Sequence, residues 1–195
     1  NPQPEKNDPV WEGHTDGAIY ACEVAPEVRV GSIIAGYQIP FWAATPPALP
    51  PPDPRVLAQQ AMDSMNLKAI NIGIVPEDRP GSIGIIGMPS WMWVEAPAEN
   101  TMGPITRSAS ARGYTVTAVA KVTKIVWNMG DGRTVTCTGP GTPYADSYGK
   151  QSSPTCGHTY TRQGRYTVSA TSYWTVEWAG IGQTGTIPID FTTRT

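Results

Sequence analysis

The sequence predicts a mainly β protein. Charged residues make up only 15% of the 195 residues, and Lys and Glu, which helical proteins use in large numbers, are sparse. Gly and Pro number 20 each without a regular period, which indicates many turns and extended connections. Several segments also alternate apolar and polar residues with period two, the pattern of strands that bury one face.

The overall charge and hydropathy limit the classes of partner. The net charge is −2, so the chain has no basic field that would attract nucleic acid or an anionic membrane surface. No apolar run is long enough to span a membrane. We interpret the start, Asn1-Pro2-Gln3-Pro4, as a processed terminus from which a signal peptide has been removed.

The three cysteines predict one disulfide bond. No C-x-x-C pair occurs, and His14 and His158 lie far apart, which argues against a structural zinc site. Cys137 and Cys156 flank a loop rich in Gly, Pro, Ser and Tyr, and a disulfide that closes this loop stabilises by roughly 3 kcal/mol. Such a bond indicates an oxidising compartment, so we expect a secreted or cell-surface protein.

Cys22 is the odd cysteine of this set, and three fates are open for it. It is a free, buried thiol, or it is an intermolecular residue that pairs with a partner chain or with a cysteine outside this sequence, or it competes for the predicted disulfide. A catalytic thiol is disfavoured because Cys22 lies in an expected strand without a local nucleophile signature.

The N-terminal part reads as strands followed by a spacer. Residues 18–24 form an expected strand, and residues 28–30 and 31–41 can form further strands. Residues 45–54 are rich in proline and favour polyproline II, which predicts a semi-rigid spacer on the surface. The alternative for this spacer is recognition by an aromatic groove of a partner.

One helix is predicted, over residues 55–65. Asp53 is a favourable N-cap, and Pro54 suits the first helical position. Apolar residues then recur at helical spacing on one face, namely Leu57, Ala58, Ala61, Met62 and Met65.

Two apolar segments after the helix are predicted to be strands. Residues 67–75 end at a proline, and residues 82–94 read as one or two strands broken at residues 87–89. Trp91 and Trp93 are two positions apart, so on a strand they share a face. This pair is either part of the core or an exposed platform on which sugar rings stack.

The C-terminal part has the clearest strand pattern. Residues 114–122 alternate with period two, and the parity shifts between Val122 and Ile125, which predicts a bulge or corner. Residues 166–178 alternate over a length that favours a midway bend or a run across two sheets. A further strand is expected over residues 133–137, followed by a long insert over residues 138–155. A turn over residues 180–185 leads into the final strand, over residues 186–193.

A motif order within this part resembles the polycystic-kidney-disease-type (PKD) repeat, an immunoglobulin-like extracellular β-sandwich. Residues 127–132 read W-N-M-G-D-G, residues 158–160 read H-T-Y, and Gly164 precedes Tyr166-Thr167-Val168. The departures are Met129, where the family usually has Phe, and the insert of residues 138–155. The resemblance implies structural roles for Trp127, Gly130, Asp131, Gly132, His158 and Tyr160.

Two roles are open for Asp131 in the Gly-Asp-Gly turn. We expect its carboxylate to stabilise the turn by accepting hydrogen bonds from nearby backbone amides. The weaker alternative is a calcium ion bound by Asp131 and Asp146, because Ca²⁺ needs six or more oxygens. The wider pattern, from the proline-rich spacer to the cysteine-bounded loop, also resembles uncharacterised secreted actinobacterial PKD-domain proteins. That second resemblance carries no established activity.

The expected organisation is therefore an immunoglobulin-like (PKD-like) β-sandwich with an N-terminal extension. Residues 1–52 form an extended and strand segment with the proline-rich linker. Residues 53–110 add a helix and strands that pack on the sandwich, and residues 111–195 form the sandwich itself.

No catalytic motif, phosphate-binding loop or metal-binding set occurs, so we expect no enzyme activity, cofactor or metal. The leading hypothesis is a secreted structural or interaction protein with protein partners, or one that self-assembles into a cell-surface or extracellular fibre. One route is an extended N-terminal arm that adds a strand to a neighbour's sheet edge. The alternative is a module that binds a cell-surface glycan through exposed Trp residues, with candidate ligand-binding residues Trp91, Trp93, Tyr144 and Tyr148.

Overall fold

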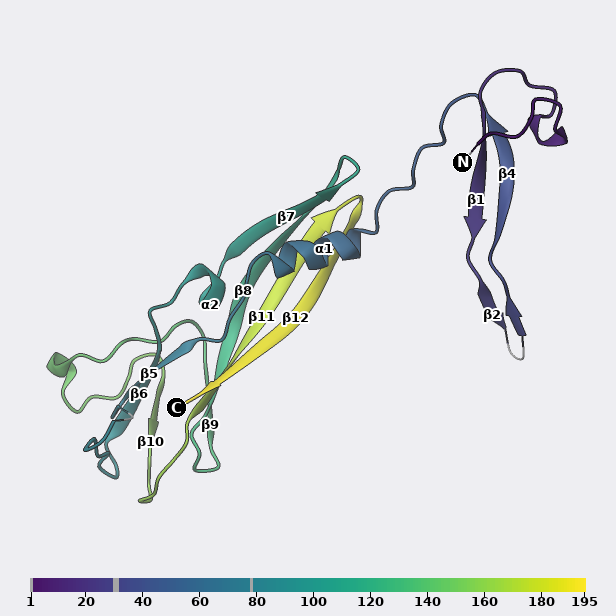
Figure 1. Ribbon diagram of the computed structural model, residues 1–195. Helices are drawn as coiled ribbons and strands as arrows, with labels where there is room; N and C mark the ends of the chain where they lie inside the picture. Colours follow the sequence, from purple (N-terminus) through teal and green to yellow (C-terminus); the bar gives the residue numbers. More distant parts are fainter. Residues whose placement is uncertain (1, 30–31, 78) are drawn as a thin grey trace. The chain divides into compact units, whose positions relative to one another are not determined.

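The computed structural model describes residues 2–29, 32–77 and 79–195. The chain divides into two compact units, Asn1–Pro50 and Pro51–Thr195 (Figure 1). The division falls inside the proline-rich segment predicted as a spacer, where the chain forms neither helix nor strand before Pro54. Each unit is therefore described by itself.

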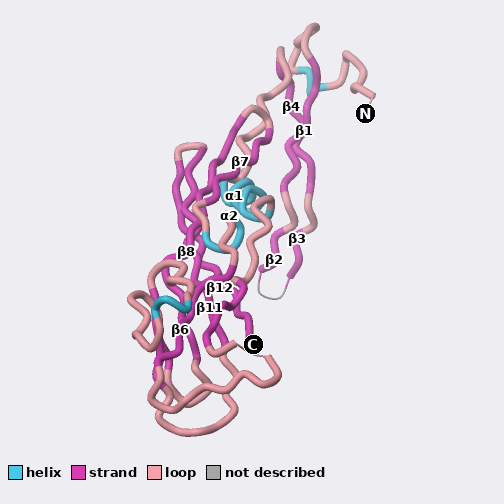
Figure 2. Tube along the Cα trace, turned by 90° about the vertical axis from the view of Figure 1, so that its left-hand side faces the viewer, coloured by secondary structure: helices cyan, strands magenta, loops and turns pink. Residues whose placement is uncertain are grey.

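The N-terminal unit is built on a long β-hairpin, which we call the arm. Strand β1 (Ala18–Val24) pairs antiparallel with β4 (Tyr37–Ala43), and β2 (Glu27–Arg29) pairs antiparallel with β3 (Ser32–Ile34) further along the arm. Figure 2 shows the two ladders as successive parts of one hairpin. The predicted strand over residues 18–24 is confirmed. The further strands match the predicted ranges only in part, because β2 begins one residue earlier, at Glu27, and β4 continues to Ala43. Val30 and Gly31 lie outside the described residues.

The segment before β1 folds back onto the base of the arm. A short 3₁₀ helix, η1 (Pro9–Trp11), places the Trp11 ring where only 2% of the residue is exposed. The Lys6 ammonium lies 3.3 Å from the centre of that ring. The His14 ring stacks on Trp42 of β4 at 3.5 Å. These contacts explain why the base of the arm is half-buried while its middle is exposed.

The larger unit is organised on a five-stranded antiparallel sheet. Its strands run in the order β12-β11-β8-β7, with β9 also paired to β8. Because β8 has 15 residues, β7 pairs with its first half and β9 with its end. The strand bounds are β7 Ile105–Ala111, β8 Tyr114–Asn128, β9 Thr134–Cys137, β11 Ser169–Gly180 and β12 Gln183–Arg194.

A bulge keeps one face of this sheet apolar along its whole length. In the β8–β11 ladder, Val122 pairs with Trp174 and Lys124 pairs with Tyr173, so Thr123 is the extra residue. The shift returns Ile125 to the face that Val122 occupies, because side chains alternate across a strand. The bulge predicted between Val122 and Ile125 is thus confirmed, and β11 stays within one sheet.

Two elements cover this apolar face, in a sandwich-like arrangement. Helix α1 (Pro54–Asp63) lies across β7, β8 and β11 (Figure 1). The rest of the face packs against a three-stranded sheet of order β10-β6-β5, made of Gly157–Thr159, Pro89–Glu95 and Asn71–Val75. Under α1 the core includes Leu57, Ala61, Val116, Ala120 and Trp174, and under the small sheet Met92, Val94, Ile125, Trp127 and Ala170.

Local signals explain α1. The Asp53 carboxylate accepts a hydrogen bond from the Arg55 amide at 2.8 Å, as the N-cap signal predicted. The predicted apolar face is buried, although the helix ends at Asp63, and Met65 is buried just beyond the helix.

Several predicted elements differ from the structure. Residues 82–88 are loop, because turns such as Ser82 N–H to Arg79 C=O and Met88 N–H to Ile85 C=O use the backbone groups locally. Residues 67–70 and 166–168 are irregular. The structure also contains a short helix, α2 (Glu99–Met102), that the sequence pattern did not predict. The β11–β12 turn is also tighter than predicted, since Ile181 and Gly182 alone form it, both with positive φ.

The packing of α1 predicts that substitutions at two neighbouring residues change the free energy of unfolding by very different amounts. Leu57→Ala is expected to lower the free energy of unfolding by about 2–5 kcal/mol, because it leaves a cavity beneath the helix. Val56→Ala, on the exposed side, should change it by less than about 0.5 kcal/mol. Urea unfolding of both variants measures the difference, and equal effects would contradict the described helix orientation.

Candidate functional site

The Gly-Asp-Gly turn follows directly from the end of β8. The Met129 amide donates to the Arg133 carbonyl, and the Gly130 amide donates to the Asn128 side chain, both at 3.0 Å. Gly130 has φ +74°, and a Cβ there would lie 2.7 Å from the Thr167 carbonyl oxygen. Only glycine fits this position without moving the chain.

A hydrogen-bonded cluster fastens β10 to this turn. His158 Nε2 lies 2.9 Å from Asp131 Oδ2, and the two side chains are 7% and 14% exposed. Because an ionised carboxylate only accepts, His158 donates in this bond. The Tyr160 hydroxyl donates to the Met129 carbonyl at 3.0 Å, and the Tyr160 ring stacks on Tyr166 at 4.6 Å.

The electrostatics of this cluster favour a structural role. Burial by itself would raise the pKa of Asp131, but hydrogen bonds from His158 and from the Arg133 amide outweigh it and hold that pKa below its usual 3.8. Burial, together with the charges of Asp131 and Tyr166, raises the pKa of Tyr160 to about 12. Both Asp131 oxygens and the Tyr160 hydroxyl are thus engaged with groups of the same chain at neutral pH.

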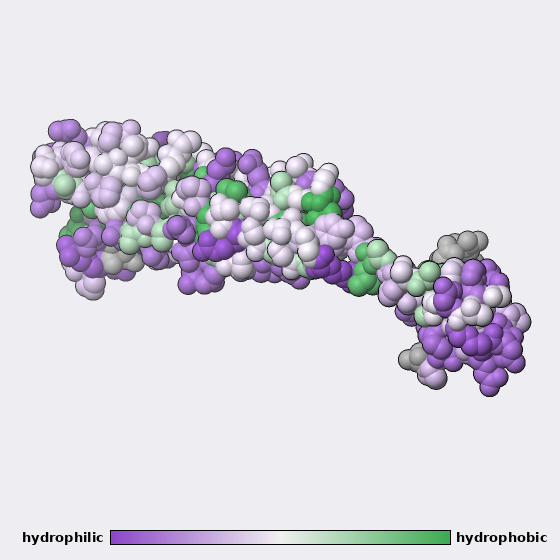
Figure 3. All heavy atoms as spheres, turned by 90° about the horizontal axis from the view of Figure 1, so that it is seen from above, coloured by the Kyte–Doolittle hydropathy of each residue, from purple (hydrophilic) through white to green (hydrophobic). Residues whose placement is uncertain are grey.

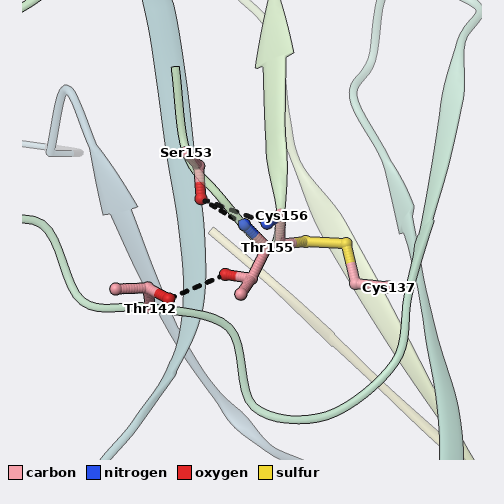
Figure 4. Close-up of a disulfide and its surroundings, with 5 residues drawn as sticks. All are labelled: Cys137, Thr142, Ser153, Thr155 and Cys156. Carbon is pink, nitrogen blue, oxygen red and sulfur yellow. Dashed lines mark hydrogen bonds between the residues drawn. A yellow bond between two sulfur atoms is a disulfide. The ribbon is translucent and has the colours of Figure 1, made fainter. Parts of the chain in front are cut away.

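The predicted disulfide is confirmed. Cys137 at the end of β9 is bonded to Cys156, which directly precedes β10 (Figure 4). Within the closed loop, the Ser153 hydroxyl accepts from the Cys156 amide at 3.1 Å, and the Thr155 hydroxyl donates to Thr142 at 3.0 Å. The bond therefore joins the two sheets at the point where the insert begins and ends.

The insert covers Trp91, the first tryptophan of the pair in β6. The Trp91 indole N–H donates to the Gln151 carbonyl at 2.8 Å, and its ring is stacked on Tyr148 and met edge-on by Tyr144. Trp93 donates to the Glu95 carboxylate and packs over Gly73. The exposed fractions of Trp91 and Trp93 are 1% and 9%. Of the two interpretations of this pair, burial supports packing, since stacking on sugars requires open ring faces.

The arm carries an exposed apolar surface around Cys22. Antiparallel register places Cys22 opposite Ile39 and Val24 opposite Tyr37, so the four side chains share one face, which we call the arm patch. Tyr37 is 55% and Ile39 is 48% exposed, and Cys22 is a free, exposed thiol. Cys22 is thus free, but the expectation that it is buried is wrong, because no described residue of its own unit forms a layer over this face of the arm.

The other face of the arm is mixed at the same level, with one polar pair and one pair of small apolar side chains. There Glu23 lies opposite Gln38, and Ala21 lies opposite Pro40. The sequence pattern identified β1 as a strand, but it did not identify β4 as its partner in this register. Pairing alone brings Tyr37 and Ile39 beside Cys22.

A second apolar surface lies on the loop before β6. Ile83, Ile85 and Ile86 are exposed and border an open groove of about 1220 Å³, with Arg162 and Arg165 also in its lining. The assignment of residues 82–94 to strands missed this surface. The face of the larger unit that is visible in Figure 3 carries small, separate apolar patches.

Comparison with known proteins identifies no relative of this chain. No protein-family model, no curated protein and no solved structure matches it. Within the described ranges, no helix combines the length and apolar composition needed to cross a membrane. The described part of the chain also holds no cluster of three or more His, Cys, Asp or Glu side chains that could hold a metal ion.

The Asp131–His158 contact predicts a pH-dependent contribution to stability. Asp131→Asn is expected to lower the free energy of unfolding by roughly 1–3 kcal/mol at pH 7, because it removes a charge-assisted hydrogen bond. The lowered pKa of Asp131 means that this contribution is full above the usual pKa and is lost as pH falls through the lowered value. Denaturant unfolding at several pH values, with exposed Asp190→Asn as control, measures it. If wild type and Asp131→Asn differ in unfolding free energy as much at pH 2 as at pH 7, the hydrogen bond to ionised Asp131 is not the cause.

The disulfide is expected to hold the insert over Trp91. The double variant Cys137→Ser/Cys156→Ser should lose roughly 3 kcal/mol of unfolding free energy and be cleaved faster by trypsin after Lys150. Cys22→Ser serves as the control, since that thiol is not in the bond. Cleavage at equal rates would mean that the aromatic contacts hold the insert without the disulfide.

Proposed function

We propose that this chain is a secreted, non-enzymatic structural or interaction protein, and that the arm patch is its contact surface. The observation that carries the proposal is the exposure of Cys22, Tyr37 and Ile39 on one face of the arm. Exposed apolar side chains gathered on one face mark interaction surfaces more often than scattered ones do.

The physical chemistry of a hairpin supports this assignment. An isolated two-stranded sheet is marginally stable in water and gains stability when a second layer covers its apolar face. The arm has such a face, and Glu23 and Gln38 make the opposite face compatible with solvent. A partner on the arm patch would therefore stabilise the arm while it forms the contact.

The compartment and scaffold are part of the same proposal. The Cys137–Cys156 disulfide is a bond that persists in oxidising surroundings, which supports an extracellular or cell-surface location. The two layers of the larger unit and the order of its motifs support an immunoglobulin-like, PKD-type sandwich. In that scaffold the Asp131–His158–Tyr160 cluster holds the turn, which leaves the arm to make contacts.

Glycan binding has weaker support. Of the candidate residues, Trp91 and Trp93 are buried, and Tyr144 and the partly exposed Tyr148 pack against the Trp91 ring. The other tryptophans are no more open: Trp11, Trp127, Trp174 and Trp178 are buried, and half-buried Trp42 is stacked on His14. Sugar stacking needs an open aromatic face, so we do not extend the proposal to a glycan.

The proposal is tested by a charge placed on either face of the arm. Ile39→Glu puts a carboxylate in the arm patch, whereas Gln38→Glu puts one on the opposite face, one residue away. Labelled proteins are added to intact cells of the source organism, and retention is measured after confirming equal thermal unfolding. We expect Ile39→Glu to reduce retention by about tenfold or more and Gln38→Glu to have little effect. Equal retention of all three proteins would exclude the arm patch as the contact surface.

A further inference from the structure

We propose that the partner of the arm patch is a second copy of this chain, and that the two arms pack face to face about a two-fold axis near Cys22, where a Cys22–Cys22 disulfide links them. This inference rests on the proposed function, because it names the occupant of the same surface. At this contact the assembly would be a closed dimer, and not the open-ended fibre expected from the sequence.

The contact is a face and not a strand edge, because each edge of the arm is interrupted at one position. The Gln3 side-chain amide donates to the Ile19 carbonyl at 3.2 Å and accepts from the Ile19 amide at 2.6 Å, which occupies the outer edge of β1. On β4, Pro40 has no N–H to offer a further strand. Addition of a strand to either edge is therefore disfavoured, and the apolar face remains open.

The face is suited to meeting a copy of itself. Tyr20, Cys22 and Val24 of β1 lie opposite Phe41, Ile39 and Tyr37 of β4, so it carries no charged side chain. A charged face would repel its own copy, but an uncharged apolar face is self-complementary. In a two-fold contact, the residue on the axis meets its own counterpart. Cys22 lies centrally, between Tyr20 and Val24 along the strand and beside Ile39 across it.

The size of the face explains the need for a covalent bond. Two strands of seven residues span about 23 Å by about 10 Å, or on the order of 230 Å² for each copy. A stable protein interface typically buries about 800 Å² for each partner. Apolar contact alone would thus give a short-lived pair. A second copy is a partner certain to carry a thiol at the matching position, and immunoglobulin domains also contain disulfides that bridge two facing sheets.

The bond forms by thiol–disulfide exchange with a low-molecular-weight disulfide such as glutathione disulfide. One Cys22 thiolate attacks the small disulfide, which gives a mixed disulfide and releases one small thiol. The Cys22 thiolate of the second copy then attacks the sulfur of the first Cys22 and releases the other small thiol. Two protein thiols are oxidised by two electrons, and the two released thiols carry the two protons. An oxidising compartment that forms the Cys137–Cys156 bond supplies such an oxidant.

The test follows the rate of cross-linking in the full chain. Proteins at equal concentration are incubated with glutathione disulfide and examined by non-reducing electrophoresis and light scattering. We expect wild type to form a species of about twice 20.9 kDa that dithiothreitol returns to monomer. Cys22→Ser should form no covalent dimer. Ile39→Glu should cross-link about tenfold or more slowly than wild type, whereas Gln38→Glu should match wild type.

Two results would overturn the inference. One is a wild type that stays monomeric, and the other is cross-linking at equal rates in Ile39→Glu and Gln38→Glu, which indicates random collision of exposed thiols. If either occurs while cell retention still depends on Ile39, the arm patch keeps its role with a different partner. If the dimer forms as expected but retention is unaffected by Ile39→Glu, the inference stands and the proposed function fails.

Discussion

The paired strands β8 and β11 present one apolar face that is too long for a single element to cover. The face begins near Val116 and Trp178 and continues to Trp127 and Ala170. The bulge at Thr123 keeps this face continuous, since a shift of one residue without it would turn Ile125 and Trp127 toward solvent. Helix α1 and the small sheet are both located by this constraint, because each covers one part of the same surface.

At the other end of the larger unit, the polar groups that most resemble a reactive site are used for fastening. Asp131 and His158 join the turn to β10, and Tyr160 bonds to the carbonyl of Met129. The disulfide and the insert then close over Trp91. Because these groups are directed at one another, they stabilise the structure of the larger unit. The exposed apolar features are the arm patch and the isoleucine loop.

The two units are alike at their strand edges, which proline or a side chain interrupts, but they differ in whether the apolar face of the sheet is covered. In the larger unit, the edge strand β12 carries Pro188, which has no N–H to offer a further strand. In the arm, Gln3 and Pro40 occupy comparable edge positions. The apolar face of the large sheet is covered within its own unit, whereas the apolar face of the arm is not. This difference is the physical basis for assigning contact to the arm.

Local patterns in the sequence were sufficient for the elements whose signals lie within a few residues. The alternation in β8 and β11, the parity shift at the bulge, the cap at Asp53 and the cysteines flanking one loop each predicted what the structure contains. Other features depend on segments far apart in the chain. The loop at residues 82–88, the cover over Trp91 and the exposed position of Cys22 follow from pairing and packing partners that no local pattern specifies. The Gly-Asp-Gly turn could thus be found from sequence, but only the tertiary structure decided that its polar groups are engaged internally and that the arm carries an exposed apolar surface.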